Sequence, residues 1–587
     1  MHLRALCTPG LGFLLLLLSL SACGAKAGEG IDAGGGEVQS LQITPEDVEL
    51  TVVNGALVQQ AYTVMATYAD GETIDVTDSI SLSVDNAQVG SFLSDVFQTS
   101  GFAGGESIVR ANLGEQSAET GIVVVLKTER VEDGSPLNAA DIFDAATEDP
   151  LLAPSLVYPD DQTYLPPNLG DFEVHWTSGA QTDLYEISLT SAYSSLRLFT
   201  TQNAASGAFA KFTPAEWSTV GESARGQDVQ FQVRALNTAA PETVGASDAR
   251  TAKLTDTNVE GGIYYWASSG ALPGGVYRHD MGRPGQSAEA FYTTAETPNS
   301  RCVACHVLSR DGEKMAVTYD GGNGAASIVD VASKTPLLAT DRTFEWNFAA
   351  FEPSGDRIVT VRQGVLTLRD VTTGDVINTV PTQGAVSHVD FSATGDKIAY
   401  AAVATPASDW SFSGGSIVVQ TFEPGSAMWG TPVTLYQPPA GTNAYYPSFS
   451  PDGEWVLFNQ SATSSYDAAT AELFVMRADG STEPLRLDSP NVTSGLTNSW
   501  ARWAPFVQEL RPTGETPEQF FWLTFSSKRA FGVRLGQGTP QLWMTPFFPS
   551  RAAAETDPSG PAFRLPFQEL NTNNHIAQWT TRIVPID

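Results

Sequence analysis

Short runs of alternating apolar and polar residues follow one another through the first part of the chain. The clearest runs are residues 41–44, 48–52, 62–68 and 120–126. Successive side chains of a strand point to opposite faces, so each run predicts a strand with one buried face. Polar turns such as Asp70-Gly71 separate the runs. Strands this short at this spacing predict an antiparallel β-sandwich over residues 38–127.

A second group of strand-like runs predicts another sandwich over residues 155–257, with strands near 172–176, 184–189 and 229–236. The intervening residues 128–154 are rich in Asp, Ala and Pro, which predicts a linker. His175 is out of phase with Val174 and Trp176, so we expect its side chain to face solvent.

From residue 258 to 587 the pattern becomes a repeat, in which a large residue precedes a tight turn and a further apolar strand. The large residues are Leu308, Phe351, Phe391, Phe449, Trp503 and Trp579. Turn signals such as Asp311-Gly312 and Asp452-Gly453 follow the first four. Repeated four-stranded units of this kind predict a β-propeller of about six blades. The early strands near 262–266 and 276–279 are expected to complete the last blade and close the ring.

Three resemblances accompany these patterns. Residues 66–77, Ala-Thr-Tyr-Ala-Asp-Gly-Glu-Thr-Ile-Asp-Val-Thr, resemble the bacterial Ig-like group 2 domain. Residues 155–257 resemble a fibronectin type III domain, and the repeat resembles a TolB-like β-propeller. The resemblances imply two spacer modules, with adhesion as the other role of such domains. The predicted fold class is all-β: two Ig-like β-sandwiches followed by a roughly six-bladed TolB-like propeller.

The N-terminus has the pattern of an export signal. Arg4 precedes a short apolar core at residues 11–20, which is too short to span a bilayer. The following Leu-Ser-Ala-Cys23 resembles the bacterial lipobox, which implies a signal peptide over residues 1–22 and a diacylated Cys23. Gly24 implies transfer to the outer membrane, facing the periplasm or the cell surface. Residues 23–37 are Gly-rich and predict a flexible tether.

Charge and cysteine content narrow the function. The chain has 32 Lys plus Arg against 66 Asp plus Glu, a net charge of −34, which excludes nucleic acid as a partner. Cys7 leaves with the signal and Cys23 carries lipid, so Cys302 and Cys305 are the remaining two of 4 cysteines. Two cysteines this close cannot form a disulfide framework, so they serve a local purpose.

That purpose is suggested by Cys302-Val303-Ala304-Cys305-His306, the Cys-x-x-Cys-His pattern of covalent c-type haem attachment. In this interpretation haem c bonds to Cys302 and Cys305, and His306 is an axial iron ligand. A Cys302–Cys305 disulfide is a second interpretation. A zinc or copper site is a third, although only these three ligands are clustered in sequence.

The repeat predicts where the Cys-x-x-Cys-His motif lies in the propeller. His306 stands two residues before its large repeat residue, as Ala349, Pro447 and Ala501 do. In TolB-like propellers this segment forms the innermost strand beside the central channel. His388 and His575 fall nearly in register with it, which makes them candidates for the second axial position, and Met281 is the thioether alternative. The competing interpretation is that these histidines cap strands by forming hydrogen bonds, as buried polar side chains usually must.

The segments 522–532 and 557–579 resemble those of secreted bacterial propeller lipoproteins that carry Cys-x-x-Cys-His before the first blade. The resulting hypothesis is an outer-membrane-anchored, haem-binding propeller for electron transfer or sensing. The alternative is a non-catalytic scaffold that binds an envelope protein or a glycan. The chain has no Gly-x-Ser-x-Gly, phosphate-loop or His-Glu-x-x-His motif, so we expect no enzymatic role, with a haem-based redox enzyme as the third possibility.

Overall fold

The structure is a computed structural model that describes most of the chain beyond the N-terminal leader. The described residues are 37–179, 181–269, 274–297, 300, 302–320, 324–338, 343–511, 516–554 and 556–586. The expected signal peptide, Cys23 and nearly all of the expected tether therefore lie outside the described residues. Among the described helices, none has the length and apolar character required to cross a membrane.

The first sandwich consists of short strands around one hydrophobic cluster that includes Val64, Phe97 and Val124. Its strands are β1 (Val38–Thr44), β2 (Val48–Val53), β3 (Gln59–Ala61), β4 (Thr63–Tyr68), β5 (Thr73–Asp75), β6 (Leu82–Val84), β7 (Gly90–Leu93), β8 (Val96–Thr99), β9 (Gly105–Leu113) and β10 (Gln116–Val131). Alternation of buried and exposed side chains along β9 and β10 matches the predicted period of two.

β10 joins the two sandwiches. Its 16 residues pair with β9 and β2 in the first sandwich and, over residues 126–131, in parallel with β16 of the second. The expected boundary at residue 127 therefore falls inside a continuous strand. The rest of the expected linker is also structured, because residues 139–145 form α1 against β19.

The second sandwich packs a three-stranded sheet, β12-β14-β17, against the continuation of the long sheet. Its elements are α1 (Ala139–Ala145), β11 (Thr147–Glu148), β12 (Ser155–Tyr158), β13 (Thr163–Leu165), β14 (Phe172–Thr177), β15 (Leu184–Thr190), β16 (Ser194–Thr201), β17 (Ala208–Phe212), α2 (Pro214–Ser223), β18 (Asp228–Asn237), β19 (Ala240–Ala246) and β20 (Arg250–Leu254). A capping box between Thr213 and Glu216, with Pro214 in the first turn, starts α2.

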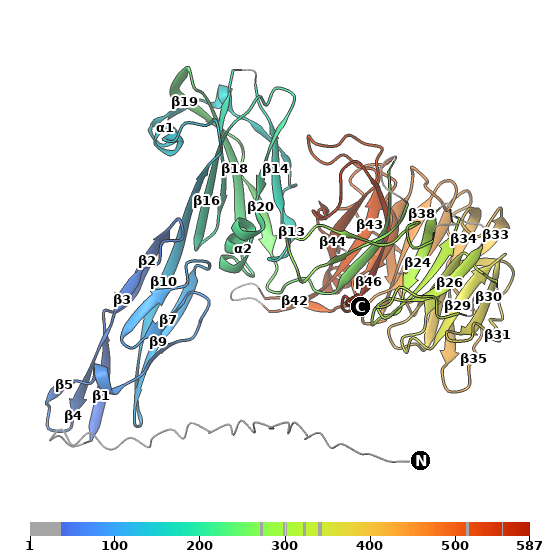
Figure 1. The fold of residues 1–587 in the computed structure, drawn as a ribbon, viewed down its shortest axis with the longest axis horizontal. Helices are drawn as coiled ribbons and strands as arrows, with labels where there is room; N and C mark the ends of the chain where they lie inside the picture. Colours follow the sequence, from blue (N-terminus) through green and yellow to red (C-terminus); the bar gives the residue numbers. More distant parts are fainter. Residues whose placement is uncertain are drawn as a thin grey trace, which may run out of the picture.

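The described residues of the propeller form six blades, as the repeat predicts. Figure 1 shows the propeller beside the second sandwich. Blade 1 is β46 (Asn573–Thr580), β21 (Gly262–Ser268), β22 (Gly275–Asp280) and β23 (Glu289–Tyr292). Blade 2 is β24 (Val303–Leu308), β25 (Lys314–Tyr319), β26 (Ala325–Asp330) and β27 (Phe344–Glu345). Blade 3 is β28 (Phe348–Phe351), β29 (Arg357–Arg362), β30 (Val365–Asp370) and β31 (Val376–Thr379).

The later blades carry the additional short strands and the longer loops. Blade 4 is β32 (Val386–Phe391), β33 (Lys397–Pro406), β34 (Phe412–Glu423), β35 (Met428–Trp429) and β36 (Val433–Tyr436). Blade 5 is β37 (Asn443–Phe449), β38 (Trp455–Ser461), β39 (Glu472–Arg477) and β40 (Leu485–Arg486). Blade 6 is β41 (Ser499–Trp503), β42 (Gln508–Leu510), β43 (Glu518–Ser527), β44 (Gln541–Phe547) and β45 (Phe563–Arg564), with α3 (Pro549–Ala553) between the last two.

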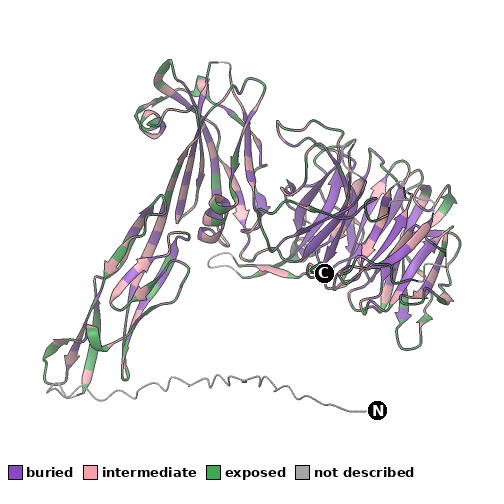
Figure 2. Ribbon diagram, viewed as in Figure 1, coloured by how far each residue is buried: buried purple, intermediate pink, exposed green. Residues whose placement is uncertain are grey.

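All six large residues of the repeat lie at or near the ends of the innermost strands. In blades 2 to 5, the turn after the innermost strand contains a glycine with positive φ: 77, 74, 73 and 75° for Gly312, Gly355, Gly395 and Gly453. A side chain in this conformation is strained, which explains glycine there. Buried residues fill the inner strands of the blades, whereas exposed residues gather in the loops and on short outer strands such as β31 and β36 (Figure 2).

The C-terminal strand closes the ring. β46 pairs antiparallel with β21, the first strand of the propeller, and forms the inner edge of blade 1. The register places Trp579 opposite Ile263 and His575 opposite Trp266. This confirms the predicted closure, in which the first strands of the repeat complete the last blade.

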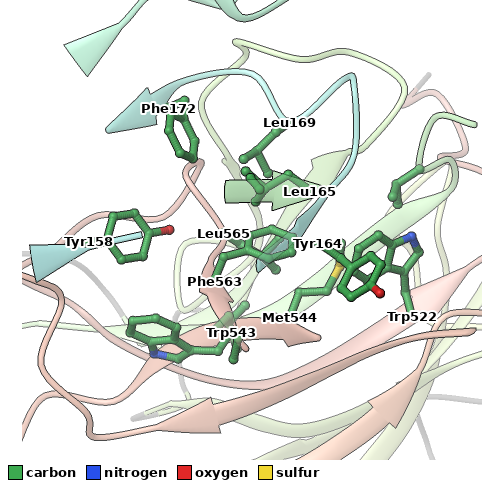
Figure 3. Packing of buried hydrophobic residues seen from close by; sticks show 14 of the residues in the cluster. Tyr158, Tyr164, Leu165, Leu169, Phe172, Trp522, Trp543, Met544, Phe563 and Leu565 are labelled. Carbon is green, nitrogen blue, oxygen red and sulfur yellow. The ribbon is translucent and has the colours of Figure 1, made fainter. Parts of the chain in front are cut away.

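The second sandwich and the propeller share one hydrophobic cluster. Tyr158, Tyr164 and Phe172 of the sandwich belong to one cluster with Trp543 and Phe563 of blade 6 (Figure 3). An apolar cluster of this kind fixes the two units together, because separating them would expose large aromatic surfaces.

His175 does not face solvent, contrary to the expectation from its phase. Its side chain is fully buried between β14 and a propeller loop, 4.6 Å from the Phe531 ring. Its Nδ1 accepts the Val533 N–H at 3.4 Å, and Arg534 pairs with Glu173 at 2.6 Å. The strand alternates as predicted, but its outer face is covered by the propeller instead of water.

Closure of the ring provides a stability test. Ile263 is completely buried opposite Trp579, so Ile263→Ala removes packing at the seam and should lower the free energy of unfolding of the propeller by about 2–5 kcal/mol. Urea unfolding followed by tryptophan fluorescence measures the change. Val365→Ala, at a side chain 46% exposed on β30, is the matched control and should change it by less than about 0.5 kcal/mol. Equal effects of the two substitutions would contradict the role of the seam.

Candidate functional site

Five of the six innermost strands share an irregularity that brings side chains toward the propeller axis, and β28 is the regular one. His388, Tyr446, Trp500 and Ile576 have φ of 47, 50, 56 and 56°, each at a shift in strand register. Positive φ is costly for such residues, and a bulge redirects the side chain that it contains. The corresponding shift in β24 falls between Ala304 and Val307, so Cys305 occupies the equivalent position.

These residues meet in an axial aromatic cluster, defined here as Phe348, His388, Tyr446, Trp500 and Ile576. Tyr446 stacks on Trp500 at 4.0 Å, and the His388 ring lies 3.9 Å from Tyr446 and 4.5 Å from Phe348. The cluster contains side chains from five blades, so it crosses the propeller axis.

His388 is enclosed by this cluster. Its Nδ1 accepts the Tyr446 N–H at 3.4 Å, and its Nε2 is buried with no hydrogen-bond partner among the described residues. Burial, with a smaller contribution from Arg502, lowers the pKa of His388 well below its ordinary value, so the ring is neutral. His388 does not line the cavity described next.

A cavity of about 470 Å³ adjoins the axial cluster on the face where the innermost strands begin. Its volume lies within the range of small-molecule and cofactor sites. Its side-chain walls come mainly from blades 1, 2, 4, 5 and 6, and they are Trp266, Cys302, Ala304, Cys305, Trp410, Tyr466, Asp467, Trp500, Lys528, Pro540, Asn573, His575 and Ile576. We call this space the rim cavity.

Both cysteines of the motif line the rim cavity, and they are not bonded to one another as a disulfide. Burial raises the pKa of the Cys305 thiol to about 11, although a hydrogen bond with Thr318 opposes the rise. Cys305 is therefore protonated at neutral pH.

His575 also lines the rim cavity. Its ring lies 5.5 Å from Trp266, whose indole N–H donates to the Val303 carbonyl at 2.8 Å. Burial lowers the pKa of His575 to about 4, so its imidazole is neutral at physiological pH, which is the form that binds metals. Nearby, Lys528 and Asp467 form an ion pair at 2.7 Å.

His306 points away from the rim cavity. Its Nε2 lies 3.2 Å from the Tyr264 carbonyl of blade 1, and its Nδ1 is buried with no partner among the described residues. Burial lowers its pKa to about 4. Cys305 and His306 both lie in the shift in register of β24, where Cys305 lines the cavity and His306 does not.

Met281 is remote from the cysteines. It follows β22 at the end where Asp280 pairs with Gly262, whereas Cys302 approaches Gly274, which precedes the other end of β22. The two ends are separated by about 20 Å of strand. The Met281 side chain is 2% exposed in the core cluster shared with the second sandwich.

The structure therefore places some of the expected haem-binding residues together and leaves others apart. The two thiols, His575 and an aromatic wall are placed together, but His306, His388 and Met281 are not. Within the described residues, no group of three or more His, Cys, Asp and Glu side chains is arranged to hold a metal ion. A closed zinc site of four such ligands thus has no preformed set there.

Sequence reasoning missed several wall residues. Trp410 and Tyr466 follow the second strands of blades 4 and 5, in loops with no motif of their own. Lys528 follows the second strand of blade 6, in the segment 522–532 that carries a resemblance but was given no role. The available signal was the greater length of the later repeats, which predicted longer loops but not where those loops would meet.

Comparisons with known proteins give a distant likeness. No family model and no curated protein matches the sequence. A TolB from Acinetobacter baumannii is 12% identical, with a TM-score of 0.34 over 60% of this chain and 79% of that chain. A protein assigned as TolB from Agrobacterium tumefaciens is 14% identical, with a TM-score of 0.30 over 55% and 99%. Kuenenia stuttgartiensis hydrazine synthase is 13% identical, with a TM-score of 0.29 over 46% and 67%. The assignment of a six-bladed propeller rests on the sheets themselves.

The raised pKa of Cys305 predicts slow thiol chemistry before any group is attached. At pH 8 only about one Cys305 in a thousand is a thiolate, compared with about a quarter of ordinary cysteines. Alkylation by iodoacetamide in a Cys302→Ser variant lacking residues 1–23 should rise about tenfold per pH unit from pH 8 to pH 10. The urea-unfolded variant is the control and should level off near pH 9. A native rate that levels off there too would contradict the burial of the thiol.

Proposed function

We propose that this protein is an outer-membrane lipoprotein whose propeller holds a covalent c-type haem in the rim cavity. The observation that carries the proposal is the meeting of Cys302, Cys305 and His575 on the walls of one cavity. These residues are close neighbours only because the C-terminal strand completes blade 1. When bound, the haem would supply a redox-active, ligand-binding iron for electron transfer or sensing at the envelope.

The chain's own residues have distinct parts in this proposal. Cys302 and Cys305 would hold the porphyrin through thioether bonds, and His575 would present a neutral imidazole. Trp266, Trp500 and Trp410 would cover the porphyrin faces and edges with aromatic surface, which suits a large flat apolar group. The protonated state of Cys305 leaves the thiol intact until attachment.

The position in the envelope follows from the N-terminal sequence. The Leu-Ser-Ala-Cys23 pattern supports lipid attachment, and the acidic chain of net charge −34 suits an exported soluble domain. The two sandwiches would hold the propeller away from the membrane. The partner would be an envelope redox protein or, in the alternative below, an envelope protein or glycan.

The alternative is a non-catalytic binding scaffold with a Cys302–Cys305 disulfide. The aromatic side chains at the mouth favour it, since Tyr466 is 51% exposed beside Trp410 and such surfaces bind sugars and peptides. In that case the two thiols are oxidised to each other and the cavity remains available to the ligand.

Haem attachment can be tested directly. Protein produced with the cytochrome c maturation machinery should give a c-type pyridine haemochrome spectrum, and its denatured mass should exceed the polypeptide by one haem. The double variant Cys302→Ser/Cys305→Ser is the matched control and should lose both signals while keeping its unfolding midpoint. A colourless wild-type protein with Cys302 and Cys305 oxidised to each other would overturn the haem proposal in favour of the scaffold.

The lipid anchor gives an independent test. Cys23→Ser removes the acceptor thiol, so the protein should move from the outer-membrane fraction to the soluble periplasmic fraction, and metabolic labelling with a fatty acid should be lost. Cys7→Ser lies within the expected signal peptide and should change neither result. Continued labelling of Cys23→Ser would exclude Cys23 as the anchor.

A further inference from the structure

We infer that, of the histidines and methionines in the described residues, His575 alone would bind the iron of a haem tethered in the rim cavity, and that the cavity would then admit a small exogenous ligand to that iron. This rests on the proposed function and makes it more specific, because an iron with two strong protein ligands favours electron transfer, whereas an open position favours sensing or ligand chemistry. The ligand class is a small neutral or anionic molecule that binds haem iron.

The count of possible ligands is complete for histidine and methionine. The chain has 6 His and 7 Met, and apart from His2 and Met1 all of them lie in described residues. Of the histidines, His575 alone lines the rim cavity, and no methionine does. The two histidines not yet placed relative to the cavity are also remote from it: His175 is buried at the sandwich junction, and His279 stacks on Phe567 at 4.1 Å.

The methionines lie elsewhere in the fold. Met315, Met476, Met544 and Met281 are buried in core clusters, Met428 is exposed on β35, and Met65 belongs to the first sandwich. None can supply the thioether that completes the low-spin centre of many cytochromes c.

His306, the histidine of the Cys-x-x-Cys-His motif, is held by a hydrogen bond outside the rim cavity. His306 Nε2 bonds to the Tyr264 carbonyl across the seam between blades 2 and 1, and its ring is 3% exposed. The strand directs Cys305 into the cavity and His306 out of it. Reaching the cavity would require His306 to break that bond and turn through the packed blade interface. We assign His306 as a positioning residue that fixes β24, and with it Cys305, against blade 1.

The other polar side chains of the rim cavity are weaker candidates. Lys528 is paired with Asp467 at 2.7 Å. Burial, with a smaller contribution from Asp467, raises the pKa of Tyr466, so its phenol stays protonated and is a poor ligand. Tyr466 is half-exposed at the mouth, which gives a small molecule a route from solvent.

The experiment uses the haem-loaded full chain. The ferric protein should show a high-spin spectrum. The ferric protein should bind cyanide rapidly, and the ferrous protein should bind carbon monoxide rapidly, when each probe is added at micromolar to millimolar concentration. His575→Ala should shift the ferric spectrum and weaken the near-axial histidine signature in electron paramagnetic resonance. The matched control His279→Gln changes a buried histidine outside the cavity and should leave both spectra as in the wild type.

The outcomes separate the two proposals. A loaded protein that is low-spin with two histidine ligands and binds neither carbon monoxide nor cyanide would overturn this inference while leaving the haem proposal intact. A spectrum unchanged by His575→Ala would remove His575 as the ligand and overturn the inference as well. A protein that receives no haem, with its two thiols joined as a disulfide, would overturn the proposed function itself.

Discussion

The pairing of β46 with β21 is the constraint on which the candidate site depends. This seam closes the ring of blades, and its register places His575 opposite Trp266 at the edge of the rim cavity. The cysteines reach the same cavity from blade 2. Residues separated by more than half of the propeller sequence thus become neighbours through one antiparallel ladder, whose hydrogen bonds and buried side chains hold the first and last strands of the propeller in register.

The large-scale architecture could be predicted from the sequence because it is encoded locally. A large residue near the end of the innermost strand recurs once per blade, four times before a turn glycine, and period-two strands recur in the sandwiches. Each of these patterns reflects an interaction within a few residues. The six repeat residues, from Leu308 to Trp579, accordingly lie at corresponding places on the innermost strands. The closure of the ring followed from the same pattern.

The details of the site could not be predicted in this way. Sequence adjacency in Cys-x-x-Cys-His suggests that Cys305 and His306 act together, but only Cys305 lines the rim cavity, whereas His306 contacts the Tyr264 carbonyl of blade 1. His175 illustrates the same limit. The alternation of side chains along its strand was predicted correctly, but its side chain is covered by a propeller loop that contains Phe531, more than 350 residues away in sequence. The loops of Trp410, Tyr466 and Lys528 converge only through the ring, and the positive φ of His388 and Ile576 has no mark in the sequence.

β10 has a further consequence for any encounter with a partner. One uninterrupted strand belongs to both sandwiches, and the second sandwich shares its core with blade 6, so within the described residues no hinge separates the two sandwiches from the propeller. Binding at the rim cavity then orders only the side chains that it touches, without the entropic cost of fixing the orientation of a loosely attached domain. The mouth of the rim cavity therefore keeps a fixed orientation relative to the two sandwiches. A partner meets the cavity in that orientation, so no domain rearrangement has to precede binding.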